Sequence, residues 1–211
     1  MFLSLDGIDG VGKSTQMRLL TDWLAAQGRR VVTCRDPGST PLGESLRELL
    51  LHSGEDRPIG ARAEMLMYMA ARAQLVDDVI RPALEDDAVV VSDRYLLANL
   101  VYQAHAGGLS RDAVAQVGAV AVDGVVPDRV FLLDLDPDVA DRRRGREPDR
   151  MESRGADYRQ RLRTGFLAEA QNDPRRVTVI DAANSVAAIH ASIIRVAAED
   201  LRRADLKTDR K

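Results

Sequence analysis

A nine-residue stretch near the start of the chain constrains the fold more than any other part of the sequence: Gly7-Ile8-Asp9-Gly10-Val11-Gly12-Lys13-Ser14-Thr15. It follows the apolar run Met1 to Leu5, which predicts a short buried strand, and precedes Gln16 to Gln27, where apolar residues recur at helical spacing. The pattern G-x-x-x-x-G-K-[ST] between a strand and a helix is typical of a phosphate-binding loop (P-loop). The alternative is an ordinary glycine-rich turn, but the motif and its flanks agree with each other.

The backbone of such a loop binds phosphate because its N–H groups point inward and the helix start adds partial positive charge. We expect Lys13 to reach the outer phosphates and to act in catalysis, and Ser14 to hold Mg²⁺. The residues expected to bind ATP are Gly7, Asp9, Gly10, Val11, Gly12, Lys13, Ser14 and Thr15, together with Arg142.

Length and charge exclude several classes of protein. A chain of 211 residues suits one α/β domain, here residues 1–203, followed by a polar tail, 204–211, that we expect to be disordered. The net charge of −3 gives no reason to expect nucleic-acid binding. No apolar run is long enough for a membrane span, and no leader precedes the first strand. The single cysteine, Cys34, is consistent with a cytoplasmic protein.

Strand and helix patterns alternate along the whole chain. Five apolar runs predict strands: Met1–Leu5, Arg30–Cys34, Ala88–Asp93, Asp128–Asp134 and Val177–Asp181. Helices are predicted at Gln16–Gln27, Leu42–Leu51, Ala61–Leu84, Leu96–Gln103, Arg111–Val122, Asp157–Gln171 and Ser185–Arg203. This alternation predicts a three-layer α/β/α fold around a parallel sheet of about five strands, with ligands bound at the carboxyl ends of the strands.

A P-loop alone is compatible with a motor, a GTPase, a transporter ATPase or a small-molecule kinase. The sequence has no Asn-Lys-x-Asp motif of the kind that reads guanine in GTPases. A kinase needs an acceptor pocket and a mobile cover that excludes water, and the chain offers residues for both. A P-loop protein that binds ATP as a switch, without an acceptor, stays open as an alternative at this point.

Motifs beyond the P-loop resemble those of thymidylate kinases of the bacterial type, in the same order along the chain. They are Gly7–Thr15, Arg35–Gly38, Tyr68 with Arg72-Ala73-Gln74, Asp93–Tyr95 with Tyr102-Gln103, and Asp149–Glu152. The resemblance implies Mg²⁺-dependent transfer of the ATP γ-phosphate to dTMP, giving dTDP, usually in a homodimer. Another nucleotide or nucleoside kinase with a related pocket is the alternative within the enzyme class.

The resemblance also implies roles for charged residues near the phosphates. Asp9 would bind the deoxyribose 3′-hydroxyl or help to organise the acceptor during catalysis. Arg35 and Arg94, with Pro37 beside them, would hold the dTMP phosphate, because planar guanidinium groups grip its oxygens in pairs. Asp93 would orient Mg²⁺. The ordinary alternatives are a turn-forming aspartate, surface salt bridges and a helix cap.

A second group of residues is expected to bind the base. Tyr68 and Arg72 are four residues apart and share one helix face. By resemblance, Tyr68 stacks on thymine and Arg72 reads O4, which would reject cytosine. Asn99 and Gln103 are further polar residues for the base edge, and Tyr102 would crowd a ribose 2′-hydroxyl. A core tyrosine beside a solvated arginine is the ordinary alternative.

Two positions depart from the family pattern. Asp36 stands where bacterial relatives commonly carry glutamate, and Leu97-Ala98-Asn99 replaces a frequent serine pair. Because Ala98 lacks a hydroxyl, the strictness for dTMP over other monophosphates stays open.

An arginine-rich segment, residues 142–156, resembles the family's lid. Its like charges repel one another, and ATP would draw it shut over the migrating phosphoryl group. The P-loop residues after Asp9 include no arginine, so we expect the catalytic arginine to be Arg146 or Arg150, while Arg142 would stack on adenine. A solvated charge run is the ordinary alternative.

Overall fold

The computed structural model describes residues 1–52, 58–143 and 155–208. Five parallel strands form one sheet in the order β2-β3-β1-β4-β5. The strands are β1 (Phe2–Asp6), β2 (Val31–Arg35), β3 (Val89–Asp93), β4 (Arg129–Asp134) and β5 (Val177–Asp181). Each lies within one residue of a predicted run, which confirms the predicted parallel sheet.

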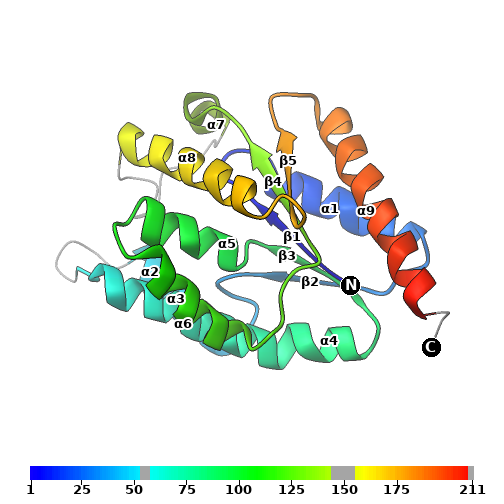
Figure 1. The fold of residues 1–211 in the computed structure, drawn as a ribbon, viewed down its shortest axis with the longest axis horizontal. Helices are drawn as coiled ribbons and strands as arrows, with labels where there is room; N and C mark the ends of the chain where they lie inside the picture. The colour runs from blue at the N-terminus through cyan, green and yellow to red at the C-terminus, as the bar shows by residue number, and fades with distance from the viewer. Residues whose placement is uncertain (53–57, 144–154, 209–211) are drawn as a thin grey trace.

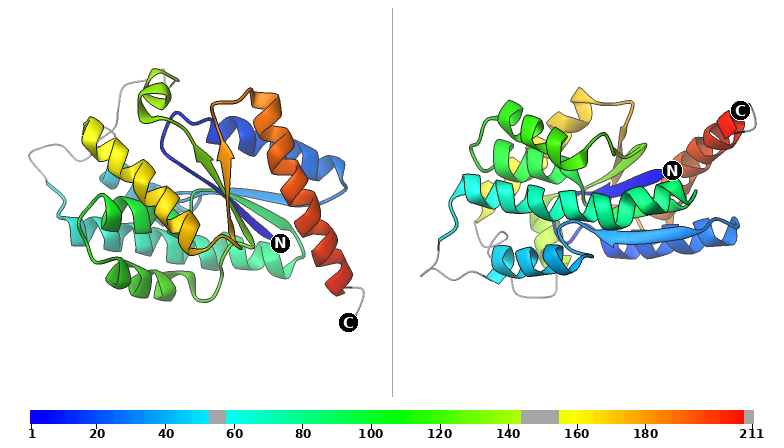
Figure 2. Two further views of the ribbon diagram at one scale, coloured as in Figure 1. Left: turned by 45° about the horizontal axis from the view of Figure 1, so that its top comes forward. Right: turned by 90° about the horizontal axis from the view of Figure 1, so that it is seen from below.

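Helices cover both faces of this sheet (Figures 1 and 2). Helices α1 (Lys13–Ala26) and α9 (Val186–Thr208) pack against each other on one face. The other face carries α2 (Pro41–His52), α3 (Ala61–Leu75), α4 (Arg81–Glu85), α5 (Leu96–Asn99), α6 (Arg111–Val122) and α8 (Ala156–Asn172). Two π-helical turns, η1 (Val76–Ile80) and η2 (Leu100–His105), continue α3 and α5. The predicted three-layer fold is therefore confirmed.

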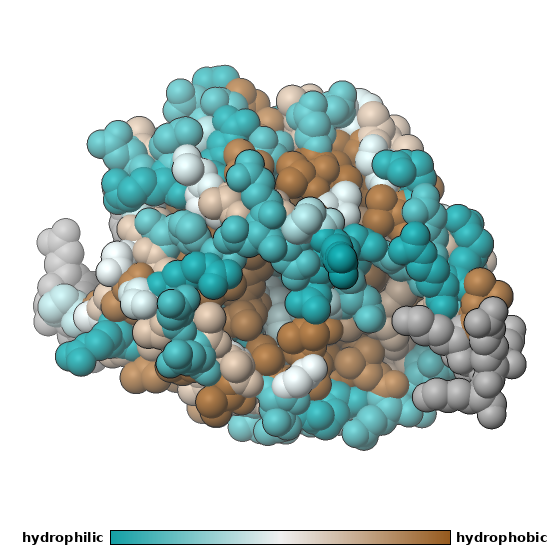
Figure 3. Space-filling model, in the orientation of Figure 1, coloured by the Kyte–Doolittle hydropathy of each residue, from teal (hydrophilic) through white to brown (hydrophobic). Residues whose placement is uncertain are grey.

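The central strands are mostly apolar because helices cover them on both sides. Every residue of β1 is buried, including the polar Ser4 and Asp6. Leu20 and Leu24 of α1 and Ile193 of α9 are also fully buried and belong to the main hydrophobic cluster. On the outer surface, hydrophilic residues cover most of the face shown in Figure 3, with hydrophobic residues gathered in patches between them.

One predicted helix, Ala61–Leu84, is interrupted by a π-helical turn. Pro82 has no N–H, so it cannot donate to the carbonyl of Asp78 as a continuous α-helix requires. The N–H of Arg81 instead bonds to the carbonyl of Val76, five residues back. The rod formed by α3, η1 and α4 nevertheless keeps its direction (Figure 2).

Other elements differ from the sequence prediction as well, most clearly α7 (Pro137–Arg143) and α9. Helix α7 was not predicted, although Asp136 Oδ1 accepts the N–H groups of Asp138 and Val139 at its start, a common capping arrangement. Helix α9 runs past Arg203 to Thr208, so the start of the tail expected to be disordered is helical.

The carboxyl ends of the strands meet at one edge of the sheet. Asp93 of β3 pairs in register with Leu5 of β1 on one side and with Arg35 of β2 on the other. The P-loop follows β1 at this edge, so the motif residues that are distant in sequence lie close together. Among the described residues, the structure contains no helix with the length and apolarity that crossing a membrane requires.

Candidate active site

The loop between β1 and α1 has the backbone of an anion-binding loop. Gly7, Gly10 and Gly12 have φ values of +135°, +86° and +97°, which L side chains rarely adopt. A Cβ on Gly10 would lie 2.1 Å from the carbonyl oxygen of Ala140, so a larger residue does not fit there. Gly12 is the N-cap of α1 and has no side chain to occupy the N–H groups of the first turn. Those N–H groups therefore suit a phosphate.

Two cations and one carboxylate converge on this loop. Asp9 Oδ1 lies 2.7 Å from Arg94 Nη2 and 3.4 Å from Lys13 Nζ. Lys13 Nζ also donates to the carbonyl of Ile8 at 2.9 Å, and Arg94 Nη1 donates to that of Gly7 at 2.8 Å. Burial alone would raise the pKa of Asp9, but Arg94 and Lys13 outweigh it and hold the pKa far below its usual range. The cluster thus concentrates positive charge beside the loop.

The backbone of Arg94 explains how its side chain reaches the loop. Arg94 follows β3 and has a φ of +67°, in the left-handed region that non-glycine residues seldom occupy. Its N–H bonds to the carbonyl of Leu5 at 2.9 Å, which ties this turn to β1. Strained backbone of this kind is concentrated at functional sites.

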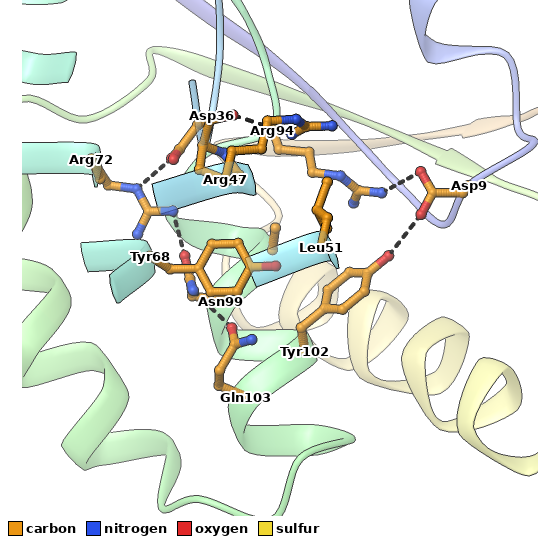
Figure 4. A pocket seen from close by; sticks show the side chains of 12 residues that line it. Asp9, Asp36, Arg47, Leu51, Tyr68, Arg72, Arg94, Asn99, Tyr102 and Gln103 are labelled. Atoms are coloured by element: carbon orange, nitrogen blue, oxygen red, sulfur yellow. Dashed lines mark hydrogen bonds and ion pairs between the residues drawn. The ribbon is translucent and has the colours of Figure 1, made fainter. Parts of the chain in front are cut away.

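A cavity opens on one side of the P-loop (Figure 4). Its lining includes eight of the residues that the sequence analysis assigned to dTMP: Asp9, Pro37, Tyr68, Arg72, Arg94, Asn99, Tyr102 and Gln103. Asp36, Arg47, Leu51 and Ala98 complete the lining. We call this space the acceptor cavity.

The end of the acceptor cavity away from the loop is polar and buried. The Arg72 side chain is 1% exposed, and its Nε donates to Asp36 Oδ2 at 2.6 Å. Its Nη2 donates to Asn99 Oδ1 (Figure 4). The alternative of a solvated Arg72 is therefore excluded. Burial raises the pKa of Asp36 although Arg72 opposes this change.

Near the loop, Tyr102 links the aromatic lining to the charged cluster. The Arg94 guanidinium lies over the Tyr102 ring, 5.1 Å from its centroid, and the Tyr102 hydroxyl lies 3.5 Å from Asp9 Oδ2. The Tyr68 ring lines the same cavity from α3 (Figure 4). The cavity therefore has Arg94 at its P-loop end and a buried polar edge at the other, with aromatic rings along it.

Arg35 differs from the sequence expectation. It does not line the acceptor cavity, and its Nη2 instead donates to both carboxylate oxygens of Glu44 at 2.8 Å. Side chains alternate between the faces at the end of a strand, so Asp36 turns toward the cavity where Arg35 does not. Arg47 of α2 lines the cavity, and the sequence does not reveal this because Arg47 lies on a helix face with no recognised motif.

Asp6 is a second residue that the sequence analysis missed. It ends β1 directly before Gly7, and burial raises its pKa to about 7 despite the opposing effects of Arg94 and Lys13. The signal was an acidic residue closing an otherwise apolar strand. Asp6 Oδ1 and Asp93 Oδ1 are both buried without a hydrogen-bond partner among the described residues.

Buried carboxylate oxygens without a hydrogen-bond partner are candidates for binding Mg²⁺. In the parts of the chain that the structure describes, no group of three or more His, Cys, Asp or Glu residues could hold a metal by itself. Mg²⁺ usually keeps several waters and takes one or two protein oxygens plus substrate phosphates. The exposed Ser14 at the start of α1 and the unpartnered Asp93 Oδ1 fit that donor set.

A second cavity lies on the other side of the P-loop. It is lined by Gly10, Val11, Gly12, Thr15, Gln16, Arg143, Asn184, Ser185, Val186 and Ile189. Arg143 donates to the carbonyl of Ala182 at 2.8 Å. Arg142 of α7 is exposed and is not among the lining residues. Arg146, Arg150 and most of the expected lid lie outside the described residues.

A P-loop at the carboxyl edge of a parallel sheet, with one cavity on each side, is the arrangement that a small-molecule kinase needs to bind a phosphoryl donor and an acceptor. The thymidylate kinase family model matches residues 5–193. A thymidylate kinase of Bifidobacterium longum (strain DJO10A) is 46% identical over 195 residues, covering 92% of this chain and 95% of the relative. One of Symbiobacterium thermophilum is 43% identical over 204 residues, covering 96% and 95%.

The solved structures agree with the sequence relatives. The crystal structure of thymidylate kinase from Ehrlichia chaffeensis matches with a TM-score of 0.76 and 30% identity, covering 93% of this chain and 97% of that one. The chain therefore belongs to the thymidylate kinase family. It is an ATP:dTMP phosphotransferase and converts dTMP to dTDP.

Proposed function

We propose that dTMP lies in the acceptor cavity with its phosphate toward Lys13 and its base toward Arg72. The arrangement that carries this proposal is the cavity itself, which has Arg94 at the P-loop end and the buried Arg72 and Asn99 at the other. A phosphomonoester carries nearly two negative charges, which suits the cationic end. A base offers a flat face and hydrogen-bonding edges, which suit Tyr68 and the polar end.

The chain's own residues would then assist phosphoryl transfer by position and charge. Lys13 would contact the outer phosphates of ATP, and Arg94 with Arg47 would hold the dTMP phosphate in line with them. Asp9 would hold Arg94 in place and accept a hydrogen bond from the 3′-hydroxyl of the sugar. Tyr102, fixed between Arg94 and Asp9, would leave no room for a 2′-hydroxyl. ATP would occupy the second cavity through the P-loop residues Gly7–Thr15.

Ser14 and Asp93 would hold Mg²⁺ together with the phosphates. The metal would neutralise charge that develops on the β- and γ-phosphate oxygens. The unpartnered Asp93 oxygen supports this role because a buried carboxylate oxygen without a donor is costly. Arg146 and Arg150 are proposed to approach the same oxygens from the lid, and Arg142 to pack on adenine.

We also propose a homodimer in a reducing cytoplasm. Leu66 of α3 is 53% exposed and Val120 of α6 is 80% exposed, and the two helices pack side by side. A symmetric contact between copies would cover both side chains. The single cysteine, Cys34, is buried and needs no partner. Sedimentation of the wild type and of Leu66→Glu tests the dimer, and an unchanged mass would contradict it.

The binding arrangement is tested by coupled ADP release with dTMP, dUMP, dCMP, dGMP and AMP as acceptors. Arg94→Ala is expected to lower kcat/KM for dTMP by about a hundredfold or more, because a buried contact to a charged phosphate is lost. Arg81→Ala is the matched control, since Arg81 pairs with Asp123 away from the cavity. If both variants lose the same activity, Arg94 does not hold the acceptor.

A further inference from the structure

A continuous chain of hydrogen bonds runs behind the base end of the acceptor cavity. Arg72 Nε donates to Asp36 Oδ2 at 2.6 Å, and Arg72 Nη2 donates to Asn99 Oδ1. Asn99 Nδ2 donates to Gln103 Oε1 at 2.7 Å, and Gln103 Nε2 donates to Glu64 Oε1 at 3.1 Å. All five residues are at most 2% exposed. Water therefore has little access with which to replace any of these bonds.

This chain of hydrogen bonds has a fixed direction because its charged members cannot exchange the roles of donor and acceptor. A guanidinium only donates hydrogen bonds and an ionised carboxylate only accepts them, whereas a side-chain amide does either. If Asn99 and Gln103 both flipped, Asn99 would present a donor to Arg72, and Gln103 would present an acceptor to Glu64. Both contacts would be repulsive. Arg72 and Glu64 therefore set the direction of the two amides from opposite ends.

The direction of this hydrogen-bond chain decides which hydrogen-bonding groups face the base. Arg72 and Asn99 line the acceptor cavity side by side, so it contains an N–H donor next to the oxygen acceptor Asn99 Oδ1. Thymine offers the complement, since its O4 accepts and its neighbouring N3–H donates. Cytosine offers the reverse, an amino donor next to an N3 acceptor. A flipped Asn99 would present a donor that opposes the N3–H of thymine and pairs with the N3 of cytosine, so only Arg72 would still favour thymine.

Glu64 is the end of this chain that does not line the cavity. It lies in the first turn of α3, one turn before Tyr68, and is linked to the base edge through Gln103. We propose that Glu64 is a positioning residue that determines pyrimidine selectivity by fixing the direction of the Gln103 and Asn99 amides. This inference rests on the proposed location of the base.

The first test is Glu64→Gln, which keeps the size of the side chain. A glutamine at this position can donate as well as accept, so it no longer opposes the flipped amides. The ratio of kcat/KM for dTMP to kcat/KM for dCMP is expected to fall about fivefold to tenfold, as the loss of one hydrogen-bond preference implies. The change should come mostly from KM, because the contact is made before transfer.

The second test is the exchange Glu64→Gln with Gln103→Glu. A glutamate at 103 only accepts, so Asn99 Nδ2 must donate to it again, while the new glutamine at 64 donates from the other side. The selectivity ratio should return to within about twofold of wild type, even if the added charge weakens binding of both nucleotides. The matched control is Asp200→Asn, which alters a carboxylate that is 12% exposed and pairs with Arg129 on the far face.

The outcomes separate this inference from the proposed location of the base. If Glu64→Gln lowers the melting temperature but leaves the selectivity ratio unchanged, Glu64 is only structural and the inference is wrong. Failure of the exchange to restore a lowered ratio would also overturn it. Arg72→Met tests the location itself. An unchanged KM for dTMP in that variant would overturn both proposals, whereas a raised KM with no effect of Glu64→Gln overturns only this one.

Discussion

The buried pair of Arg72 and Asp36 makes a quantitative prediction about stability. Their side chains are 1% and 0% exposed, and Arg72 Nε lies 2.6 Å from Asp36 Oδ2. Removing one partner of such a pair leaves the other buried without compensation, at a cost of about 3–5 kcal/mol. For a chain of this size, that corresponds to a fall in Tm of about 6–20 °C. We expect such a fall for Arg72→Met and for Asp36→Asn.

The double variant distinguishes this pairing from two independent contributions. With both charges absent, neither partner is left unpaired, so the double variant should be at least about 2 kcal/mol more stable than the sum of the single effects predicts. Urea unfolding followed by circular dichroism measures all four proteins of the cycle. The pair of Arg129 and Asp200, which are 13% and 12% exposed, serves as a control. Removing one partner of that pair should lower the free energy of unfolding by a smaller amount. Additive effects at Arg72 and Asp36 would refute the reasoning.

Three further predictions follow from the site. Lys13→Ala should lower kcat about a hundredfold or more, because a cation beside the migrating charge is lost, and near-wild-type turnover in the ADP-release assay would contradict this role. Tyr68→Leu should raise KM for dTMP about tenfold with kcat nearly unchanged, as loss of base stacking implies; a fall in kcat alone would argue against stacking. Burial raises the pKa of Asp6 from 3.8 to about 7, so the folded protein binds more protons there than the unfolded chain between those values. The free energy of unfolding should therefore fall by about 1.4 kcal/mol per unit as pH rises through that window. Asp6→Asn should remove this slope, and parallel pH profiles for the two proteins would show that Asp6 does not titrate there.

Much of the site was predictable because its residues belong to recognisable motifs. The P-loop and Asp93-Arg94 could be assigned to one sheet edge, since the carboxyl ends of parallel strands meet there, and Tyr68 with Arg72 formed a motif on one helix face. Arg47 and Glu64 could not be found in this way. Neither residue belongs to a recognised motif, and the relation of each to the cavity depends on how its helix packs.

The Arg35 expectation shows a second limit. A strand end places consecutive side chains on opposite faces, and the order of residues does not say which face will meet the cavity. Here Asp36 meets the cavity and Arg35 pairs with Glu44. The π-helical turn η2 is another such case, because it places Tyr102 and Gln103 through backbone geometry that an apolar pattern of helical spacing does not distinguish from an α-helix.

Sequence alone determined the succession of strands and helices along the chain, the phosphate-binding loop and the class of chemistry. These features depend on local patterns and short motifs. Tertiary structure decided which charges neutralise one another. The sequence predicts that Arg72 reads the base, and packing also joins it to Asp36 and Asn99 in a buried chain of hydrogen bonds. Pairing of this kind depends on distances between residues far apart in sequence and on the exclusion of water, and both exist only once the helices have closed over the sheet.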